Sequence, residues 1–305
     1  MTFAIDANLD QEARWAGAPL SAAALRRIAA AAPLLAALAP PGAEVELWAP
    51  AAIDPARLGA LAMRLRAGTP PRPELAWADP TARAVNDRRF ALALAGELGV
   101  ALPGARGVAT LAELDAATAA IAGRWVCKAA WTASGRDRGF GDGAPAGETR
   151  TYLARLLARG PAVVEPWLER TADLGVCARV DPQGRIIAEP PHALRVDPRG
   201  GFAGIALRAS IAPEHRAALD RVVAAAGAAL ARAGYAGPFG VDAFVHRGGL
   251  HPLCELNARH TFGHVAHALA ARLGTRVLGL RGPPPPGARV LIAPGGDDPF
   301  TAWGA

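Results

Sequence analysis

The stretch R-W-V-C-K-A-A-W-T-A-S-G-R-D-R-G-F-G-D-G, residues 124–143, contains Lys128, the only lysine among the 33 Lys and Arg residues of the chain. Its apolar first part, residues 124–130, is typical of a buried strand, and the polar, glycine-bearing part that follows predicts a loop. A lysine near the end of a strand can place a compact positive charge on a phosphate, while backbone N–H groups of the loop cover that phosphate. The spacing G-x-x-x-x-G-K-[ST] is absent, so the segment does not predict a P-loop.

A second group of polar residues lies in two later segments. Asp242 belongs to F-G-V-D-A-F-V, and Glu255 and Asn257 belong to L-C-E-L-N-A-R. The segments predict two strands joined by an R-G-G turn, in which Glu255 and Asn257 point to one face and Asp242 can come opposite them. Two carboxylates and an amide oxygen are hard ligands that suit Mg²⁺. Arg259, which follows, adds the positive charge that a transferring phosphoryl group needs.

Between these groups lies V-V-E-P-W-L-E-R-T-A-D-L-G-V, residues 163–176. It predicts a hydrophobic strand that leads into Glu165. The backbone of such a segment can hydrogen-bond an adenine ring. An acid further along the chain could hold ribose hydroxyl groups.

This order of pieces resembles the ATP-grasp family over roughly residues 86–273. The resemblance implies that Lys128 contacts the nucleotide phosphates and that Arg259 stabilises acyl-phosphate chemistry. It also implies a set of nucleotide-binding residues, namely Ser134 and Gly135 in the phosphate loop, Glu165, Trp167 and Leu168 at the adenine hinge, and Asp173 at the ribose. Asp242, Glu255 and Asn257 would hold Mg²⁺. Members of the family join a carboxylate to an amine or another nucleophile and release ADP.

The sequence departs from the family pattern at two places. Many members carry a further lysine at the start of the second lobe, where this chain has N-D-R-R-F, so Arg88 would take its place. The phosphate loop is also poorer in glycine and contains Arg136 and Arg138, which could hold phosphate themselves.

The fold expected is α/β, with a small N-terminal α/β lobe followed by two lobes that hold ATP between them. The expected boundaries are 1–84, 85–168 and 169–305. In the first lobe we expect helices at 21–38 and 54–67 and strands at 44–50 and 73–79. In the second we expect a capping box at Thr110 and Glu113. The third should be mostly antiparallel, with a hairpin turning at D-P-Q-G (181–184) and a long helix from Pro213.

Composition narrows the function classes. The net charge of +6 comes from scattered arginines with no basic stripe, so we expect no nucleic-acid partner. The longest apolar stretch, residues 28–43, is interrupted by prolines, so we expect no membrane span. The N-terminal residues have no basic region before an apolar one, and three widely spaced cysteines suggest reduced thiols, so we expect a cytoplasmic protein. The expected partners are a small-molecule acid and amine, and homo-oligomerisation is compatible with the sequence.

Two other functions are compatible with the sequence. H-T-F-G-H-V-A-H places His260, His264 and His267 on one helix face, which a zinc-dependent hydrolase could use together with Glu255. The more economical interpretation puts His260 at the mouth of an acceptor site and His267 at the surface. The other function is a nucleotide-binding regulator, which would bind ATP without turnover.

Overall fold

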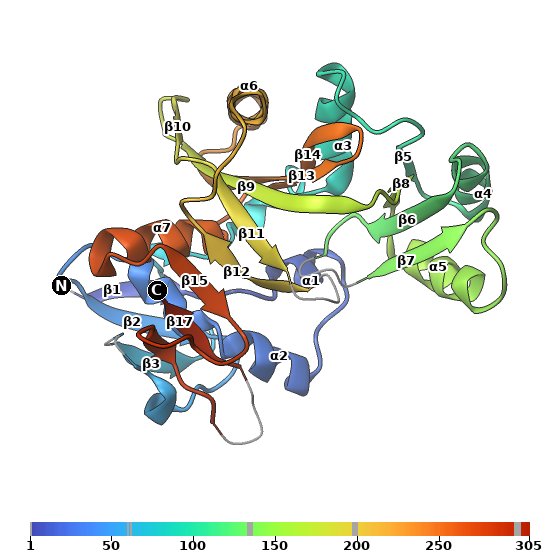
Figure 1. Ribbon diagram of the computed structural model, residues 1–305. Coiled ribbons are helices and arrows are strands. Elements are labelled where there is room, and N and C mark those ends of the chain that lie inside the picture. The colour runs from blue at the N-terminus through green and yellow to red at the C-terminus, as the bar shows by residue number, and fades with distance from the viewer. Residues whose placement is uncertain (1, 60, 62, 133–136, 197–200, 296–299) are drawn as a thin grey trace.

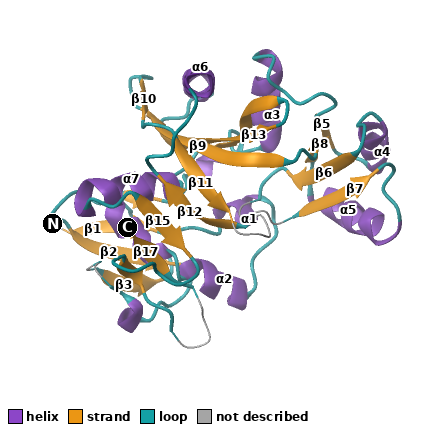
Figure 2. Cartoon of the chain, in the orientation of Figure 1, coloured by secondary structure: helices purple, strands orange, loops and turns teal. Residues whose placement is uncertain are grey.

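The computed structural model describes residues 2–59, 61, 63–132, 137–196, 201–295 and 300–305. Within these residues the strands form three sheets, one parallel and two antiparallel. In Figure 1 the first sheet lies at the left, the largest runs through the middle, and the smallest lies at the right. Figure 2 shows helices α4 (Leu111–Ala119) and α5 (Gly147–Arg159) beside the small sheet.

The N-terminal sheet has the order β3-β2-β1-β4, with all neighbours parallel. Its strands are β1 (Thr2–Asp6), β2 (Glu44–Ala49), β3 (Arg64–Ala67) and β4 (Leu75–Ala76). The short helices near this sheet are α1 (Gln11–Trp15), α2 (Ala22–Ala29) and the 3₁₀ turns η1 (Ala32–Leu38), η2 (Pro55–Arg57) and η3 (Pro80–Arg83). The expected strand at 44–50 is confirmed, and the one at 73–79 is reduced to two residues.

The prediction of a helix at 54–67 is wrong. Asp54 does cap a helical turn, by accepting a hydrogen bond from the Ala56 N–H at 2.9 Å, but that turn is only η2. The chain then continues into the edge strand β3, where Arg66 pairs with Glu46 of β2 at 2.9 Å and Arg64 pairs with Glu44. Alternate arginines that pair with alternate glutamates favour the strand.

The expected single helix at 21–38 is instead two pieces. Ser21 caps α2 by accepting from the Ala24 N–H, and α2 ends at Ala29. Pro33 lacks the N–H that would continue the helical hydrogen bonds, and the chain resumes as the tighter helix η1.

The small antiparallel sheet has the order β5-β8-β6-β7. Its strands are β5 (Arg106–Val108), β6 (Arg124–Ala129), β7 (Arg138–Asp142) and β8 (Ala162–Pro166). The predicted capping box is confirmed, since Thr110 and Glu113 exchange hydrogen bonds at the start of α4. This sheet has its own apolar core, in which Trp125 and Leu153 are completely buried.

The large sheet is antiparallel and runs β14-β13-β9-β11-β12-β15-β17-β16, with β10 paired to β9. Its strands are β9 (Arg170–Val180), β10 (Ile186–Ala188), β11 (His192–Val196), β12 (Phe202–Ala206), β13 (Gly237–His246), β14 (Gly249–Asn257), β15 (Val277–Leu280), β16 (Arg289–Ile292) and β17 (Ala302–Gly304). Both predicted hairpins and the helix from Pro213 are confirmed. The three helices not yet given are α3 (Arg88–Glu97), α6 (Pro213–Arg232) and α7 (Phe262–Leu273).

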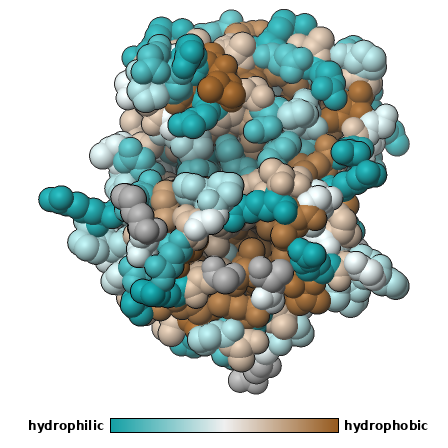
Figure 3. Space-filling model, turned by 90° about the vertical axis from the view of Figure 1, so that its left-hand side faces the viewer, coloured by the Kyte–Doolittle hydropathy of each residue, from teal (hydrophilic) through white to brown (hydrophobic). Residues whose placement is uncertain are grey.

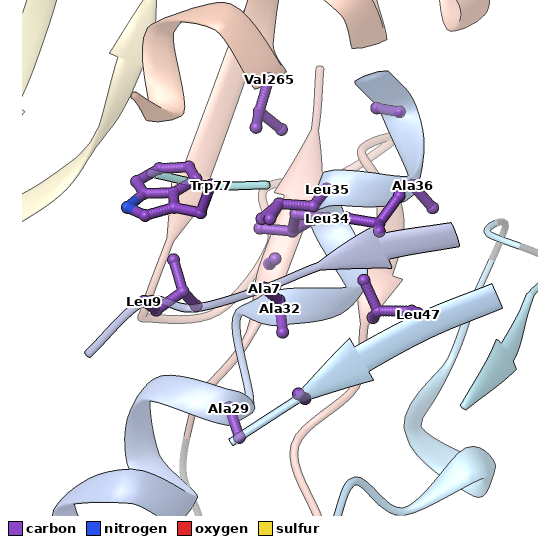
Figure 4. Packing of buried hydrophobic residues seen from close by; sticks show 14 of the residues in the cluster. Ala7, Leu9, Ala29, Ala32, Leu34, Leu35, Ala36, Leu47, Trp77 and Val265 are labelled. Carbon is purple, nitrogen blue, oxygen red and sulfur yellow. The ribbon is translucent and has the colours of Figure 1, made fainter. Parts of the chain in front are cut away.

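The largest apolar core joins the two ends of the chain. Figure 4 shows Val265 of α7 above Leu34 and Leu35 of η1, with Trp77 beside them. The last strands close the same core, because the Gly59 N–H donates to the Leu291 carbonyl at 3.0 Å and Arg57 Nε donates to the Ala293 carbonyl at 2.9 Å. The N-terminal sheet and the second half of the large sheet therefore form one body.

The molecular surface is uneven on the side that Figure 3 shows. It is hollowed between an upper and a lower half, and hydrophobic residues gather in the lower half. Among the described residues, no helix is both long enough and apolar enough to cross a membrane.

Candidate functional site

One cavity of about 400 Å³ lies where the three sheets approach one another. It has two ends of different character. We call the first the charged end; the residues that line it are Glu12, Arg88, Lys128, Arg138, Trp167, Arg170, Asp173, Asp242, Cys254, Glu255, Asn257 and Arg259. We call the second the aromatic end; it is lined by Arg27, Ile28, Trp77, Leu194, Phe202, Phe262 and Arg281, among others.

Lys128 and Glu165 form an ion pair at the charged end. In the register of β6 and β8, Lys128 lies opposite Val163 and Val126 lies opposite Glu165, so the paired side chains are diagonal neighbours on one face. Both residues are 9% exposed. Burial by itself lowers the pKa of Lys128, but the Glu165 carboxylate outweighs it and the net shift is upward, so the lysine is charged at neutral pH.

Arg88 joins the same cluster from α3, which begins where Asp87 accepts a hydrogen bond from the Arg89 N–H at 2.8 Å. The Arg88 guanidinium donates to the carbonyls of Ala129 and Thr132 and lies 3.1 Å from Glu255 Oε1. Burial raises the pKa of Glu255, but the charges of Arg88 and its neighbouring cations more than offset this, and the pKa is lowered. Arg88 therefore does lie at the charged end, beside the end of the Lys128 strand.

The β13–β14 hairpin brings the three predicted metal ligands together. Asp242 lies directly opposite Glu255, as the sequence suggested, and Asn257 Nδ2 donates to Asp242 Oδ2 at 3.3 Å. Burial raises the pKa of Asp242 to about 7, with a further contribution from the negative charge of Glu255. A divalent cation between these oxygen atoms would relieve that repulsion. The two facing carboxylates therefore fit a hard cation such as Mg²⁺, while Asn257 turns its Nδ2 toward Asp242 and its Oδ1 toward Arg259.

Arg259 follows the hairpin and links three parts of the molecule. Its guanidinium donates to Asn257 Oδ1 at 2.9 Å and to the His260 carbonyl at 3.0 Å, and it pairs with Glu12 of α1. It also lies over the Trp77 ring, 5.4 Å from the centroid. Arg259 thus lies where the charged end meets the aromatic end, and it contacts Asn257 and Glu12 of the first and Trp77 of the second.

Only some of the residues expected around a nucleotide base and ribose line the cavity. Trp167 and Asp173 line the cavity, and Arg170 donates to Asp173 Oδ1 at 2.8 Å. Glu165 does not line this cavity itself but pairs with Lys128, which does. Leu168 follows β8 and is not among the residues that line the cavity. Ser134 and Gly135 fall outside the described residues.

Sequence reasoning missed Arg170 and Glu12. Arg170 lines the cavity and packs on its neighbours, 4.2 Å from the centroid of the Phe244 ring and 3.7 Å from Cys254 Sγ. Its spacing of three from Asp173 was a usable signal. Glu12 had none, because its partner Arg259 lies almost at the other end of the chain and neither residue belongs to a local motif.

The three histidines of the zinc interpretation have other partners. His260 Nδ1 contacts the Ala76 carbonyl at 3.1 Å, and His264 contacts Thr261 and the Ala178 carbonyl. His267 is partly buried, contrary to the expected surface position, and lies 3.8 Å from Glu189. Within the part of the chain that the structure describes, no group of three or more His, Cys, Asp or Glu side chains could hold a metal ion. The geometry gives the zinc hydrolase no support.

No family model matches the sequence, and no curated protein matches it significantly. Solved structures do match. N5-carboxyaminoimidazole ribonucleotide synthetase from Thermus thermophilus is 15% identical, with 100% of this chain and 94% of that chain covered and a TM-score of 0.60. Phosphoribosylamine–glycine ligase from Thermotoga maritima is 13% identical, with 100% and 90% covered and a TM-score of 0.58.

A third match is the biotin carboxylase domain of the Hydrogenobacter thermophilus 2-oxoglutarate carboxylase, in a complex with MgADP, ADP and bicarbonate. It is 12% identical, with 90% of this chain and 83% of that chain covered and a TM-score of 0.59. All three are ATP-grasp enzymes. The chain therefore has the ATP-grasp fold, and the resemblance seen in the sequence is confirmed at the level of the fold.

Proposed function

We propose that the protein is an ATP-dependent ligase that joins a carboxylic acid to an amine or another nucleophile and releases ADP and phosphate. One observation carries this proposal. Lys128 of β6, the facing pair Asp242 and Glu255 of the hairpin, and Arg259 after it converge on a single cavity in an ATP-grasp fold. Basic groups for phosphates, oxygen ligands for a hard cation and a further cation at the edge are the parts that phosphoryl transfer requires.

In this proposal ATP lies between the second and third lobes, 85–168 and 169–305, with its phosphates on Lys128 and Arg88. Both cations are already held by carboxylates, Glu165 and Glu255. These carboxylates keep the cations charged and in place, and the nucleotide phosphates would compete with them. The base and ribose would lie toward Trp167 and Asp173.

Asp242, Glu255 and Asn257 would hold Mg²⁺. The bound cation would neutralise negative charge on the phosphate oxygens. The side chains do the remaining positioning: Arg88 fixes the Glu255 carboxylate, and Arg259 fixes the Asn257 amide through its oxygen.

The reaction has two steps. An oxygen of the acid attacks the γ-phosphorus, the bond from that phosphorus to the β–γ bridging oxygen breaks, and ADP leaves. The nucleophile then attacks the acyl carbon of the mixed anhydride, its proton is released, and phosphate departs with the electrons of the C–O bond. Arg259 stabilises the charge that develops on the transferred group. Catalysis is mainly positioning and charge stabilisation, so the site needs few proton-transfer groups.

The substrates in this proposal are small molecules, and the cell compartment is the cytoplasm. The three cysteines are free thiols, two of them fully buried, which suits a reducing compartment.

An ADP-release screen tests the proposal. Purified protein is incubated with Mg²⁺-ATP and pairs of acids and amines, and ADP is measured with a coupled assay. We expect ADP to appear only with one acid class, and the ligated product to appear only when the amine is present. ATP binding by calorimetry with no ADP from any pair would contradict the ligase and favour the nucleotide-binding regulator.

A further inference from the structure

The aromatic end of the cavity has a continuous wall of rings. Trp77, after β4, lies 5.2 Å from Phe262 of α7 between ring centroids, and Phe262 stacks on Phe202 of β12 at 6.0 Å with an interplanar angle of 26°. Ile28 of α2 and Leu194 of β11 continue the apolar lining. A surface of this kind favours a ligand with an apolar, ring-sized body.

The wall packs against the largest apolar core and begins beside Arg259. Trp77 is 4% exposed, and its carbonyl accepts the His260 N–H at 2.9 Å. Val265 of α7 lies in the apolar core that joins the two ends of the chain. The Arg259 guanidinium covers the Trp77 ring, so Trp77 supports the wall from behind, and one end of a bound molecule would meet Arg259 while its body lies on the partly exposed rings of Phe262 and Phe202.

Two arginines stand at the aromatic end with exposed side chains. Arg27 comes from α2 and Arg281 from the turn after β15, and both line the cavity. Within the described residues neither guanidinium has a hydrogen bond or an ion pair. At the charged end Arg88, Arg170 and Arg259 each pair with a carboxylate, whereas Arg138, which lies over the Phe140 ring, has no ion pair within the described residues. Unpaired guanidinium groups beside an apolar wall favour an anionic group on the ligand.

The turn after β1 offers no second site for an anionic group. It reads A-N-L-D-Q-E, residues 7–12, with no glycine to let the backbone approach a phosphate. Asp10 and Glu12 are buried in it and each pairs with an arginine. Helix α1 is a single short piece of five residues. The anion is therefore expected at Arg27 and Arg281.

We propose that the aromatic end is the substrate subsite, and that it takes a compound with an apolar, ring-sized body and a carboxylate remote from its reacting end. The body lies on Phe262 and Phe202, which Trp77 supports from the core, and the remote carboxylate is held by Arg27 and Arg281. The reacting group faces Arg259. This assignment rests on the proposed ligase function for the meaning of the reacting end, but ligand binding itself does not require turnover.

Calorimetry without nucleotide tests the subsite. The probes are 4-phenylbutyrate, its neutral amide 4-phenylbutyramide, and glutarate, which has carboxylates but no ring. We expect 4-phenylbutyrate to bind most tightly and each of the other two to bind at least about ten-fold more weakly, because each lacks one recognition element. Equal affinity for 4-phenylbutyrate and glutarate would overturn the role of the aromatic wall.

Variants locate the carboxylate. Arg27→Gln/Arg281→Gln should weaken 4-phenylbutyrate binding about ten-fold or more and leave the affinity for Mg²⁺-ATP unchanged. The exposed Arg216→Gln on α6 is the matched control. If the double variant binds the probe normally while Arg259→Ala does not, the carboxylate sits at the charged end and the proposal is overturned. Probe binding without ADP release from any acid would contradict the ligase alone and leave the subsite standing.

Discussion

At the charged end of the cavity Lys128, Arg88 and Arg259 each meet a carboxylate, whereas at the aromatic end Arg27 and Arg281 meet none among the described residues. These three paired cations are mostly buried, and Arg27 and Arg281 are exposed. A ligand at the charged end must compete with internal acids, and removal of either partner leaves a buried charge alone. A ligand at the aromatic end meets cations that are already available. Substitutions there should affect binding with little effect on stability.

Arg259→Ala should have the largest effect on turnover. We expect near-normal ATP affinity but a loss of roughly 2–4 kcal/mol of transition-state stabilisation, which lowers kcat by about 30- to 1,000-fold. The measurement is ADP formation with the cognate acid and amine, beside ATP affinity by calorimetry. Arg259→Ala leaves the buried Glu12 carboxylate without its ion-pair partner, which should lower stability. The double variant Glu12→Gln/Arg259→Ala should therefore regain stability but not turnover. Wild-type turnover in Arg259→Ala would move the reaction centre elsewhere.

Lys128 tests whether the internal ion pair competes with the nucleotide. Mg²⁺-ATP should raise the melting temperature of the wild type, because a ligand of the folded state stabilises it by mass action. Lys128→Ala should lose about 1.5–3 kcal/mol of binding and most of the shift, and Lys128→Arg should lose part of it. Glu165→Gln removes the competing carboxylate, so it should keep or enlarge the shift. An unchanged shift in Lys128→Ala would show that the lysine is incidental.

At neutral pH the smallest effect is expected at His192, which lines the same cavity and acts on the unfolding free energy only below about pH 6.5. Burial lowers the pKa of His192 to about 3, with a further contribution from the charge of His267. The folded state therefore prefers the neutral ring. The stability that this preference contributes is complete above about pH 6.5 and is lost as the pH falls, at up to about 1.4 kcal/mol per pH unit toward pH 4.

The variant His192→Gln should flatten the dependence of the unfolding free energy on pH between about 6.5 and 4. The comparison is made by urea unfolding at several pH values, without ligand. His215→Gln, on the outer helix α6, serves as the control and should keep the wild-type slope. The same slope in His192→Gln and wild type would mean that other buried groups account for the acid sensitivity.

Much of the charged end could be predicted because its residues lie on regular strands. The two-residue period put Glu255 and Asn257 on one face, and the short R-G-G turn fixed the hairpin that sets Asp242 opposite Glu255. The single lysine drew attention to β6. These signals are local, so the sequence carries them without knowledge of the tertiary structure.

The remainder depends on contacts between distant segments. No sequence pattern near Glu12 predicts its contact with Arg259. Likewise, no pattern near Phe202 predicts its contact with Phe262, or that of Phe262 with Trp77. The strand β3 was mistaken for a helix because the apolar spacing before it fits both, and only the paired glutamates of β2 decide between them. The aromatic end therefore could not be assembled from the sequence.

The strands that close the N-terminal body have a consequence for biosynthesis. Arg57 and Ala293 are hydrogen-bonded although 236 residues separate them, and Leu291 and Ala302 belong to the core that also contains Ile5. At about 5–20 residues per second, a ribosome needs on the order of 10–50 s to make the intervening chain. The N-terminal sheet thus emerges well before the segment that completes its apolar core. It would spend that interval exposed to chaperones, while the small sheet with its separate core can fold as it leaves the ribosome.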